Sequence, residues 1–301
     1  MVGAASGTQE AVALDAAYAH CLRLAHRHYE NFTVLSWLTP RRLRRHRAAL
    51  YAYCRTVDDL GDEMPGERLA LLDAFEAQLD GAIKGDASEP LFLALADTIA
   101  RFDLPREPFT RLIEANRIDQ RSQRYASFED VLHYCRHSAN PVGRLVLMMH
   151  GYRDAERVRL SDATCTALQL ANFWQDLARD AAAGRIYLPQ DDMARFGVCD
   201  VDLSKSCASD ALRALVRFQV DRARDLFAEG LGLLGRVSGH LRVELALFSR
   251  GGLAILDAIE SQSFDTLRSR PTLSSSAKRR MIAETLFDLS VRKTPWRTQW
   301  I

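Results

Sequence analysis

The chain has 301 residues, of which 48% are hydrophobic and 26% are charged, and its formal net charge is +1. This composition is typical of a soluble globular protein, and the near-zero net charge gives no electrostatic reason to expect a nucleic-acid partner. No run approaches the roughly 18 consecutive apolar residues of a membrane-spanning helix, and the N-terminus lacks the basic start and apolar core of a signal peptide. We therefore expect a cytoplasmic protein.

Apolar residues recur with a helical period along the whole chain, whereas alternating strand patterns and hairpin turns are nearly absent. No linker rich in Pro, Gly or Ser interrupts the pattern. The sequence therefore predicts an all-α protein with a single domain over 1–301, whose core covers about 15–290 between short N- and C-terminal tails. The expected helices cover 9–31, 39–62, 65–84, 89–103, 106–122, 127–152, 159–183, 207–235, 238–264 and 274–290.

The helix expected over 39–62 begins with a basic cluster, "PRRLRRHR" at 40–47. Thr39 can serve as its N-cap with Pro40 at the first helical position. The ordinary interpretation of the cluster is a solvated helix face, and contact with an anionic membrane surface is the alternative.

The same helix ends in an acidic stretch, "DDLGD" at 58–62. Asp58 and Asp62 are one helical turn apart, Asp59 follows Asp58, and Arg55 lies one turn before Asp59. Because the helix dipole disfavours acids at a C-terminus, these carboxylates require a cation. A pair with Arg55 on the same helix is the ordinary solution, and a metal ion is the alternative.

Pro141 interrupts the helical pattern over 127–152, within "SANPVG". Proline removes a backbone donor and clashes with the preceding turn, so we expect a kink at this point.

A second acidic stretch, "QLANFWQDLARD" at 169–180, places Gln169, Asn172, Asp176 and Asp180 at steps of three, four and four residues. At about 100° per residue this spacing puts all four on one face of a helix. Mg²⁺ takes oxygen ligands from a few carboxylates and leaves positions for phosphate oxygens. Two such helices facing each other would hold several Mg²⁺ ions and a diphosphate, and would neutralise the diphosphate as it leaves carbon.

Three further features have ordinary interpretations. "GLGLLG" at 230–235 fits a dinucleotide-binding fingerprint, but a helix precedes it where that motif requires a strand, so we expect a helix end and a turn. The tail at 292–301, with Trp296 and Trp300, fits either a disordered end or a membrane interface. The six cysteines lack metal-binding spacing, which favours reduced, partly buried thiols.

The motifs together resemble the squalene/phytoene synthases, all-α enzymes of head-to-head isoprenoid condensation. The resemblance covers about 15–290, and within the family it is strongest to the bacterial hopanoid-pathway branch that makes hydroxysqualene from presqualene diphosphate. It implies an isoprenoid-synthase-type helical bundle around a central cavity. The matching motifs are "HYENF" (28–32), "YAYCRTVDD" (51–59), "DDLGD" (58–62), "YCRHSANPVG" (134–143), "QLANFWQDLARD" (169–180) and "GRIYLP" (184–189).

The resemblance also implies roles for individual residues. For the aromatic residues among them, simple core packing is the alternative to lining a reaction cavity. The implied metal ligands are Asp58, Asp62, Asn172, Asp176 and Asp180. The implied catalytic residues are Tyr51, Arg55, Asp58, Asp62, Tyr134 and Asp176. The implied substrate-binding residues are His28, Phe32, Arg55, Gln169, Asn172, Arg185, Tyr187 and Phe264.

Two positions depart from the family pattern. Members that condense two diphosphates often carry Ser after the histidine matching His28, where this chain has Tyr29. Many carry Arg before the aspartate matching Asp176, where this chain has Gln175. The loss of a phosphate-binding Arg suits an enzyme that ionises one C30 diphosphate.

The resemblance therefore implies Mg²⁺-dependent conversion of presqualene diphosphate to hydroxysqualene, without NADPH. Condensation of two farnesyl diphosphates to presqualene diphosphate, squalene or a related C30 product is the alternative within the family. A non-catalytic assembly or binding protein that retains the fold is the alternative from another class. Besides the prenyl diphosphate, the expected partners are neighbouring enzymes of squalene synthesis and the inner face of the membrane.

Overall fold

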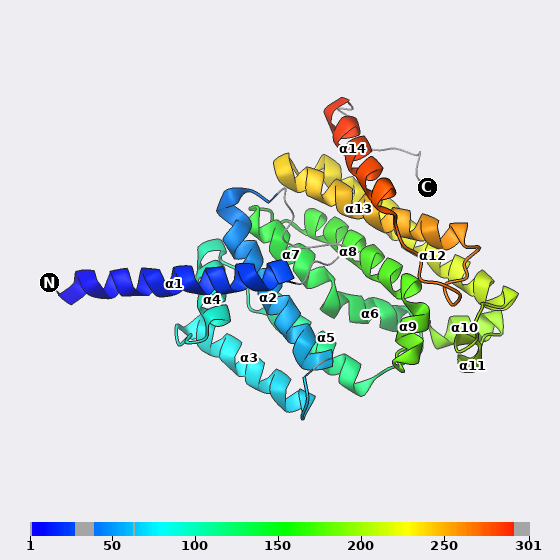
Figure 1. Ribbon diagram of the computed structural model, residues 1–301, viewed down its shortest axis with the longest axis horizontal. Coiled ribbons are helices and arrows are strands. Elements are labelled where there is room, and N and C mark those ends of the chain that lie inside the picture. Colours follow the sequence, from blue (N-terminus) through cyan, green and yellow to red (C-terminus); the bar gives the residue numbers. More distant parts are fainter. Residues whose placement is uncertain (1, 28–38, 63, 292–301) are drawn as a thin grey trace. The chain divides into compact units, whose positions relative to one another are not determined.

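The structure is a computed structural model that describes residues 2–27, 39–62 and 64–291 (Figure 1). Helices dominate these residues, and the only strand-like feature among them is an isolated bridge between Arg124 and Ile186. The predicted all-α class is confirmed. None of the helices in this part of the chain is long and apolar enough to cross a membrane. His28, Tyr29, Phe32 and the tail at 292–301 lie outside the described residues.

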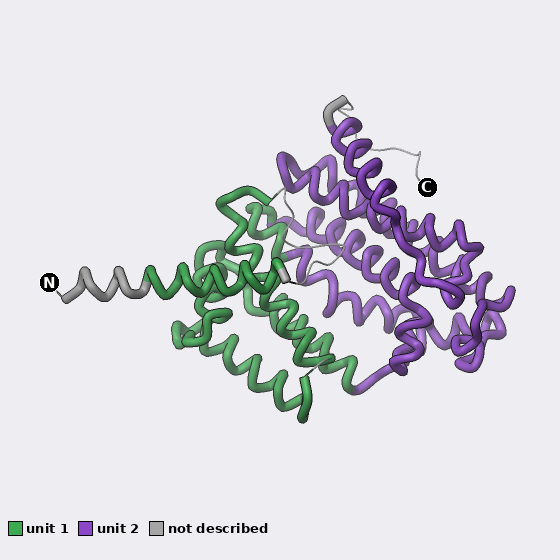
Figure 2. Tube along the Cα trace, in the orientation of Figure 1, with its two compact units in different colours: residues 1–120, 145–152 green, residues 121–144, 153–301 purple. Residues whose placement is uncertain are grey.

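The chain divides into two compact units, which Figure 2 shows in different colours. Unit 1 comprises 1–120 and 145–152, and unit 2 comprises 121–144 and 153–301. The prediction of a single domain stays a prediction.

Unit 1 has an aromatic and aliphatic core in which Tyr53 is central. The Tyr53 ring lies 5.2 Å from the ring of Phe75 and 5.3 Å from that of Phe109, and its hydroxyl donates to the Phe109 carbonyl at 3.0 Å. Tyr53 is fully buried, and its hydroxyl nevertheless has a hydrogen-bond acceptor. The helices of unit 1 are α1 (Val2–Arg27), α2 (Arg41–Asp62), α3 (Arg68–Lys84), α4 (Pro90–Phe102), α5 (Glu107–Arg121, up to 120) and the end of α7 (Asn140–Met149).

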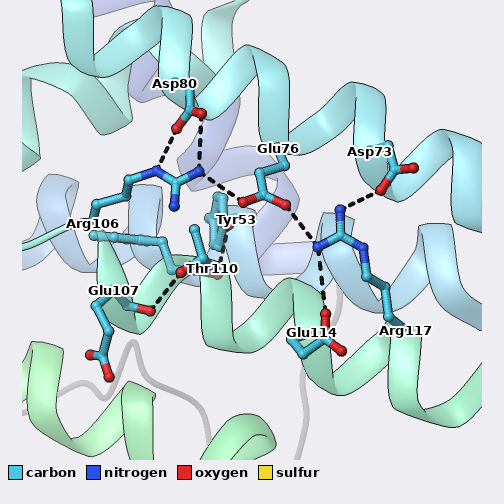
Figure 3. A network of polar contacts seen from close by, with 10 residues as sticks. Tyr53, Asp73, Glu76, Asp80, Arg106, Glu107, Thr110, Glu114 and Arg117 are labelled. Carbon is cyan, nitrogen blue, oxygen red and sulfur yellow. Dashed lines mark hydrogen bonds and ion pairs between the residues drawn. The ribbon is translucent and has the colours of Figure 1, made fainter.

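Ion pairs join α5 and the turn before it to α3 (Figure 3). The Arg106 guanidinium lies 2.5 Å from Asp80 Oδ1 and 2.8 Å from Glu76 Oε1. Arg117 lies 2.7 Å from Glu76 Oε2 and also pairs with Asp73. Exposed ion pairs contribute roughly 0–1 kcal/mol each to the free energy of unfolding, so the main effect of these pairs is to fix the register of α5 on α3.

A buried polar cluster at the start of α2 corrects the interpretation of the basic cluster. The Tyr18 hydroxyl lies 2.5 Å from Asp97 Oδ2 and 2.8 Å from His46 Nδ1, and His46 Nδ1 lies 3.0 Å from Thr98 Oγ1. His46 and Arg47 are both buried, so the cluster is not a uniformly solvated face. Burial, with Arg45 nearby, lowers the pKa of His46 to about 4. The exposed basic residues are Arg41, Arg42, Arg44 and Arg45.

The predicted cap of α2 is wrong in detail. The helix begins at Arg41, and the Thr39 hydroxyl is buried with no hydrogen-bond partner among the described residues. Thr39 therefore does not cap the helix, although the predicted start is correct to within two residues.

Unit 2 packs α12 and α13 against α8 through small residues. A Cβ at Gly252 would lie 2.3 Å from the Phe227 ring, and one at Gly230 would lie 2.2 Å from the Thr164 hydroxyl. The segment Leu231–Gly235 forms a 3₁₀ helix, which confirms a helix end and turn for "GLGLLG". The helices of unit 2 are α6 (Phe128–Ser138), the start of α7, α8 (Ala155–Gln175), α9 (Leu177–Ala182), α10 (Gln190–Phe196), α11 (Asp200–Leu203), α12 (Asp210–Gly230), α13 (Gly239–Ser261) and α14 (Ser275–Val291).

The expected kink at Pro141 is a break between two helices. A capping box of Ser127 and Asp130 starts α6, which ends at Ser138, and Pro141 is the second residue of α7. Proline fits there because the first turn of a helix needs no backbone donor.

All six cysteines are free thiols, as predicted. Their expected partial burial holds for four of them and is wrong for Cys199 and Cys207, which are exposed. Burial raises the pKa of Cys21 to about 11, which keeps that thiol protonated and unreactive.

Candidate functional site

The first acidic stretch occupies the last turn and a half of α2, within unit 1. Arg55 Nη2 lies 2.6 Å from Asp59 Oδ1, one turn further along the same helix. Asp59 therefore forms the ion pair with Arg55 on its own helix that the sequence predicts as the alternative to a metal ion. Asp58 and Asp62 are exposed, and both remain candidates as metal ligands.

Gly61, in the middle of this stretch, is where α5 reaches α2. A Cβ at Gly61 would lie 2.0 Å from Asn116 Oδ1 and 3.1 Å from Asn116 Cβ, so a side chain there would collide with α5. Gln120 donates to the Gly61 carbonyl at 3.0 Å, and Asn116 Nδ2 lies 3.4 Å from Asp58 Oδ1. Sequence analysis missed both amides, whose only signal was their i, i+4 spacing on α5.

The second acidic stretch lies across the junction of α8 and α9, in unit 2. Asp176 leaves the helical conformation, with φ −99° and ψ 12°, so the expected single helix over 159–183 is divided. The backbone hydrogen bonds nevertheless continue, from Asp176 N to the Asn172 carbonyl at 2.9 Å and from Asp180 N to the Asp176 carbonyl at 2.9 Å. Asn172, Asp176 and Asp180 therefore stay on successive turns, as predicted, with half-buried side chains.

Asp176 is held by an arginine that sequence analysis did not identify. Arg270 Nε lies 2.5 Å from Asp176 Oδ1, and Arg270 Nη2 lies 2.9 Å from Oδ2. This contact, with Asp180 also nearby, raises the pKa of the Arg270 guanidinium. One carboxylate of the second stretch thus already has a cation.

Gln175, the residue that departs from the family pattern, is buried next to this pair. Its Nε2 donates to the Pro271 carbonyl at 2.6 Å, and its Oε1 accepts from Arg270 Nη2 at 3.1 Å. The amide therefore ties the end of α8 to the segment that follows α13.

That segment, 262–274, begins with an unusual turn. Ser263 and Phe264 both have positive φ, 54° and 61°, which side-chain-bearing residues rarely adopt. The turn is held by the buried Asp265, which accepts from Ala208 N at 2.9 Å and from Arg213 Nη2 at 2.7 Å. Phe264 is half-buried, and its role in a prenyl pocket stays a prediction.

An aromatic cluster in unit 2 contains two of the predicted site residues, Tyr134 and Tyr187. The rings of Phe173 and Tyr187 stack at 3.7 Å between centroids and 8° between planes. Tyr134 lies 5.7 Å from Tyr187 and 6.0 Å from Phe173. Sequence analysis missed Tyr125, which stacks on Tyr187 at 5.6 Å. Tyr51, the remaining predicted catalytic aromatic residue, is buried in unit 1.

Backbone pairing places this cluster beside the second acidic stretch. Ile186 N donates to the Gln123 carbonyl at 3.1 Å, which brings the segment before α6 alongside the one after α9. Arg185 N donates to the Asp180 carbonyl at 2.8 Å, which holds the backbone of the predicted phosphate contact Arg185 against that of the last acid. Gln169 lies on α8 about one turn before Asn172, and both are half-buried.

The donor chemistry of both stretches fits a divalent metal held jointly with phosphate. The described residues contain no group of three or more His, Cys, Asp or Glu side chains arranged to hold an ion alone. Small sets of carboxylate and amide oxygens, such as Asn172, Asp176 and Asp180, suit Mg²⁺ because that ion retains positions for water and phosphate. The pairing of Asp176 with Arg270 indicates that this position attracts positive charge.

Comparison with known proteins identifies the family. The squalene/phytoene synthase family model matches residues 25–277. The 15-cis-phytoene synthase of Synechococcus elongatus is 33% identical over 275 residues, covering 85% of this chain and 88% of that protein. The crystal structure of squalene synthase HpnC from Alicyclobacillus acidocaldarius is 52% identical, with a TM-score of 0.81 over 84% of this chain and 96% of that one. A dehydrosqualene synthase solved in complex with a ligand is 26% identical, with a TM-score of 0.84 over 93% and 98%. The chain belongs to the squalene/phytoene synthase family.

Proposed function

We propose that this enzyme converts presqualene diphosphate to hydroxysqualene with release of diphosphate, in a reaction that depends on Mg²⁺ and not on NADPH. The 52% identity to squalene synthase HpnC supports this branch of the family. So does the resemblance of the motifs to the hopanoid-pathway enzymes.

The observation that carries the proposal is the environment of Gln175. Many family members that condense two diphosphates have an arginine at this position. Here the side chain is buried and neutral, and both ends of its amide are used by Pro271 and Arg270. A residue committed in this way supplies no charge to a second diphosphate, which suits a single C30 substrate.

The polar residues of the proposed site bind the diphosphate. The proposed Mg²⁺ ligands are Asp58 and Asp62 on α2 in unit 1, and Asn172, Asp176 and Asp180 at α8–α9 in unit 2. Bound Mg²⁺ would neutralise negative charge on the leaving diphosphate. Arg55, oriented on α2 by Asp59, and Arg185 provide positive charge for phosphate oxygens.

The aromatic residues act on the hydrocarbon. The clustered rings of Phe173, Tyr187 and Tyr134 would supply π electrons that stabilise a nearby carbocation left when diphosphate departs. Their burial limits the access of water until the cation has rearranged. A single water then adds to the cation and loses a proton, which the released diphosphate can accept, and the product is a C30 alcohol.

Condensation of two farnesyl diphosphates is the second candidate function, and the 26% identity to a dehydrosqualene synthase favours it. A non-catalytic binding protein is disfavoured, because a scaffold gains nothing from two carboxylate pairs one turn apart. For location, we propose a cytoplasmic enzyme that contacts the inner face of the membrane through the exposed arginines at the start of α2, near other enzymes of squalene synthesis.

Product analysis tests the proposal. The full chain is incubated with Mg²⁺ and presqualene diphosphate in ¹⁸O-labelled water, without NADPH, and a parallel reaction receives farnesyl diphosphate. We expect hydroxysqualene that carries the label in its hydroxyl. Ready consumption of farnesyl diphosphate alone would favour the second candidate, and squalene formed only with NADPH would contradict water as the nucleophile.

A further inference from the structure

Arg270 occupies both oxygens of a carboxylate that belongs to the proposed metal site. We propose that Arg270 competes with divalent metal for Asp176, and that Gln175 is the positioning residue that holds Arg270 in place. The inference rests on the metal site of the proposed function. It adds that the metal-free enzyme carries its own cation at Asp176.

The geometry of the pair sets Arg270 in competition with a metal for these oxygens. Arg270 Nε and Nη2 lie 2.5 Å and 2.9 Å from the two oxygens of Asp176, an arrangement of two parallel charge-assisted hydrogen bonds. A metal that approaches the Asp176 carboxylate from the side that Arg270 occupies must displace at least one of these hydrogen bonds. The Arg270 side chain is 42% exposed and that of Asp176 is 19% exposed, so the arginine can move into solvent while the carboxylate stays.

Gln175 favours the paired arrangement through two contacts. Its Oε1 accepts from Arg270 Nη2 at 3.1 Å, and its Nε2 donates to the carbonyl of the next residue, Pro271, at 2.6 Å. An arginine at 175 has only donors and a positive charge, so it would lose the first contact and repel Arg270. Glutamine at this position therefore selects the conformation in which Arg270 faces Asp176.

The backbone around Arg270 is fixed independently of this pair. Asp265, which is buried, accepts from Arg213 and from the backbone N of Ala208 and Arg268. Because the segment is anchored there and again at Pro271, exchange between arginine and metal requires movement of only one side chain.

The pair has a consequence for the empty enzyme. Asp176 and Asp180 lie one turn apart, and like charges at this spacing repel each other. Arg270 offsets that repulsion until a metal arrives, and it lowers the affinity of the site for metal alone. Metal accompanied by diphosphate gains additional ligands and overcomes this competition.

Metal binding tests the competition without any turnover. Mn²⁺ is titrated into the full chain, with no prenyl substrate, and free Mn²⁺ is followed by electron paramagnetic resonance. We expect Arg270→Gln to bind Mn²⁺ roughly tenfold more tightly than the wild type, the effect of removing a charge-assisted pair. Arg268→Gln is the matched control, since it removes the same charge from the same segment, and it should change affinity by less than about twofold. Unchanged affinity in Arg270→Gln, or an equal change in both variants, would overturn the proposal.

A double variant tests the positioning role of Gln175. Gln175→Leu keeps a similar volume and removes both amide contacts, so it should raise the Mn²⁺ affinity several-fold only while Arg270 is present. In Arg270→Gln/Gln175→Leu we expect the affinity of Arg270→Gln alone. Additive increases would show that Gln175 acts independently of Arg270.

Product analysis separates this inference from the proposed function. Hydroxysqualene formation by the wild type, together with unchanged Mn²⁺ affinity in Arg270→Gln, would contradict the competition alone. Tighter Mn²⁺ binding in Arg270→Gln, together with no conversion of presqualene diphosphate by the wild type, would contradict the proposed reaction alone.

Discussion

The acidic stretches at the end of α2 and across the α8–α9 junction both place carboxylates one helical turn apart. On α2 the arginine that pairs with a carboxylate is Arg55, which lies on the same helix as its partner Asp59. At α8–α9 the arginine is Arg270, which lies 94 residues beyond Asp176. Similar acidic patterns are thus paired with a nearby arginine in one unit and with an arginine far along the chain in the other. Only the nearby arginine can be predicted from neighbouring residues.

Charge removal at either stretch should have the largest effect. We expect Asp62→Asn and Asp176→Asn each to lower the turnover of presqualene diphosphate by at least about 10³-fold, because each removes charge from the proposed metal site. Helix content by circular dichroism should stay unchanged. Asp225→Asn, at an exposed position of α12, is the control and should keep the wild-type rate. A large loss in only one of the two site variants would remove the other stretch from the site.

A side chain at Gly61 should destabilise the protein more than one at Gly81, which lies in the same unit. Gly61→Ala places a Cβ against Asn116, and we expect a loss of about 1–3 kcal/mol in the free energy of unfolding. Gly81→Ala on α3 is the control, since its Cβ would meet nothing closer than 3.9 Å, and it should stabilise by up to about 1 kcal/mol. Urea unfolding measures both. Equal effects would mean that α5 does not constrain the first stretch.

Mild acid should destabilise the helix of the first stretch through His46. Burial lowers the pKa of His46 from 6.5 to about 4, so the unfolded chain binds a proton in this range that the folded protein does not. The contribution of His46 to the free energy of unfolding is therefore complete above pH 6.5 and is lost as the pH falls towards 4, by about 3 kcal/mol.

Urea unfolding of the wild type and His46→Gln between pH 4.5 and 7 checks this dependence. The variant should show a flatter pH profile than the wild type, because it lacks the imidazole that takes up the proton. Parallel profiles would assign the acid sensitivity to other groups.

The smallest expected effects compare two buried tyrosines. Tyr134→Phe, in the aromatic cluster of unit 2, should lower the rate roughly tenfold or change the product ratio, with less than about 1 kcal/mol of lost stability. Tyr53→Phe, in the core of unit 1, leaves the Phe109 carbonyl without its donor and should cost about 1 kcal/mol without changing the product. A wild-type rate and product profile in Tyr134→Phe would return Tyr134 to a packing role.

The helices could be predicted because their signals lie within a few residues of each other. Apolar periodicity and Pro141 are local; the all-α class is confirmed, and the kink expected at Pro141 is instead a break between two helices just before it. The spacing of Asn172, Asp176 and Asp180 was also predictable, because backbone hydrogen bonds continue through the distorted Asp176.

Other features depend on contacts that no local pattern contains. The burial of Arg47 is set by packing against other helices, and charge alone suggested a solvated face. The pairing of Asp176 with Arg270 depends on where the chain returns after α13. The metal-binding and catalytic assignments themselves stay predictions until the variants above are measured.

The segment between α13 and α14 has a consequence for engineering the chain. One extra residue between Asp265 and Arg270 would shift the arginine by about 3.5 Å, more than the length of a hydrogen bond. The turn at 85–89, between α3 and α4, is largely exposed and should accept inserted tags or permuted termini at small entropic cost. The number of residues in 265–270 therefore constrains the position of Arg270 more tightly than the identity of most side chains in that segment. Fusions and permutations of the chain should keep this number unchanged.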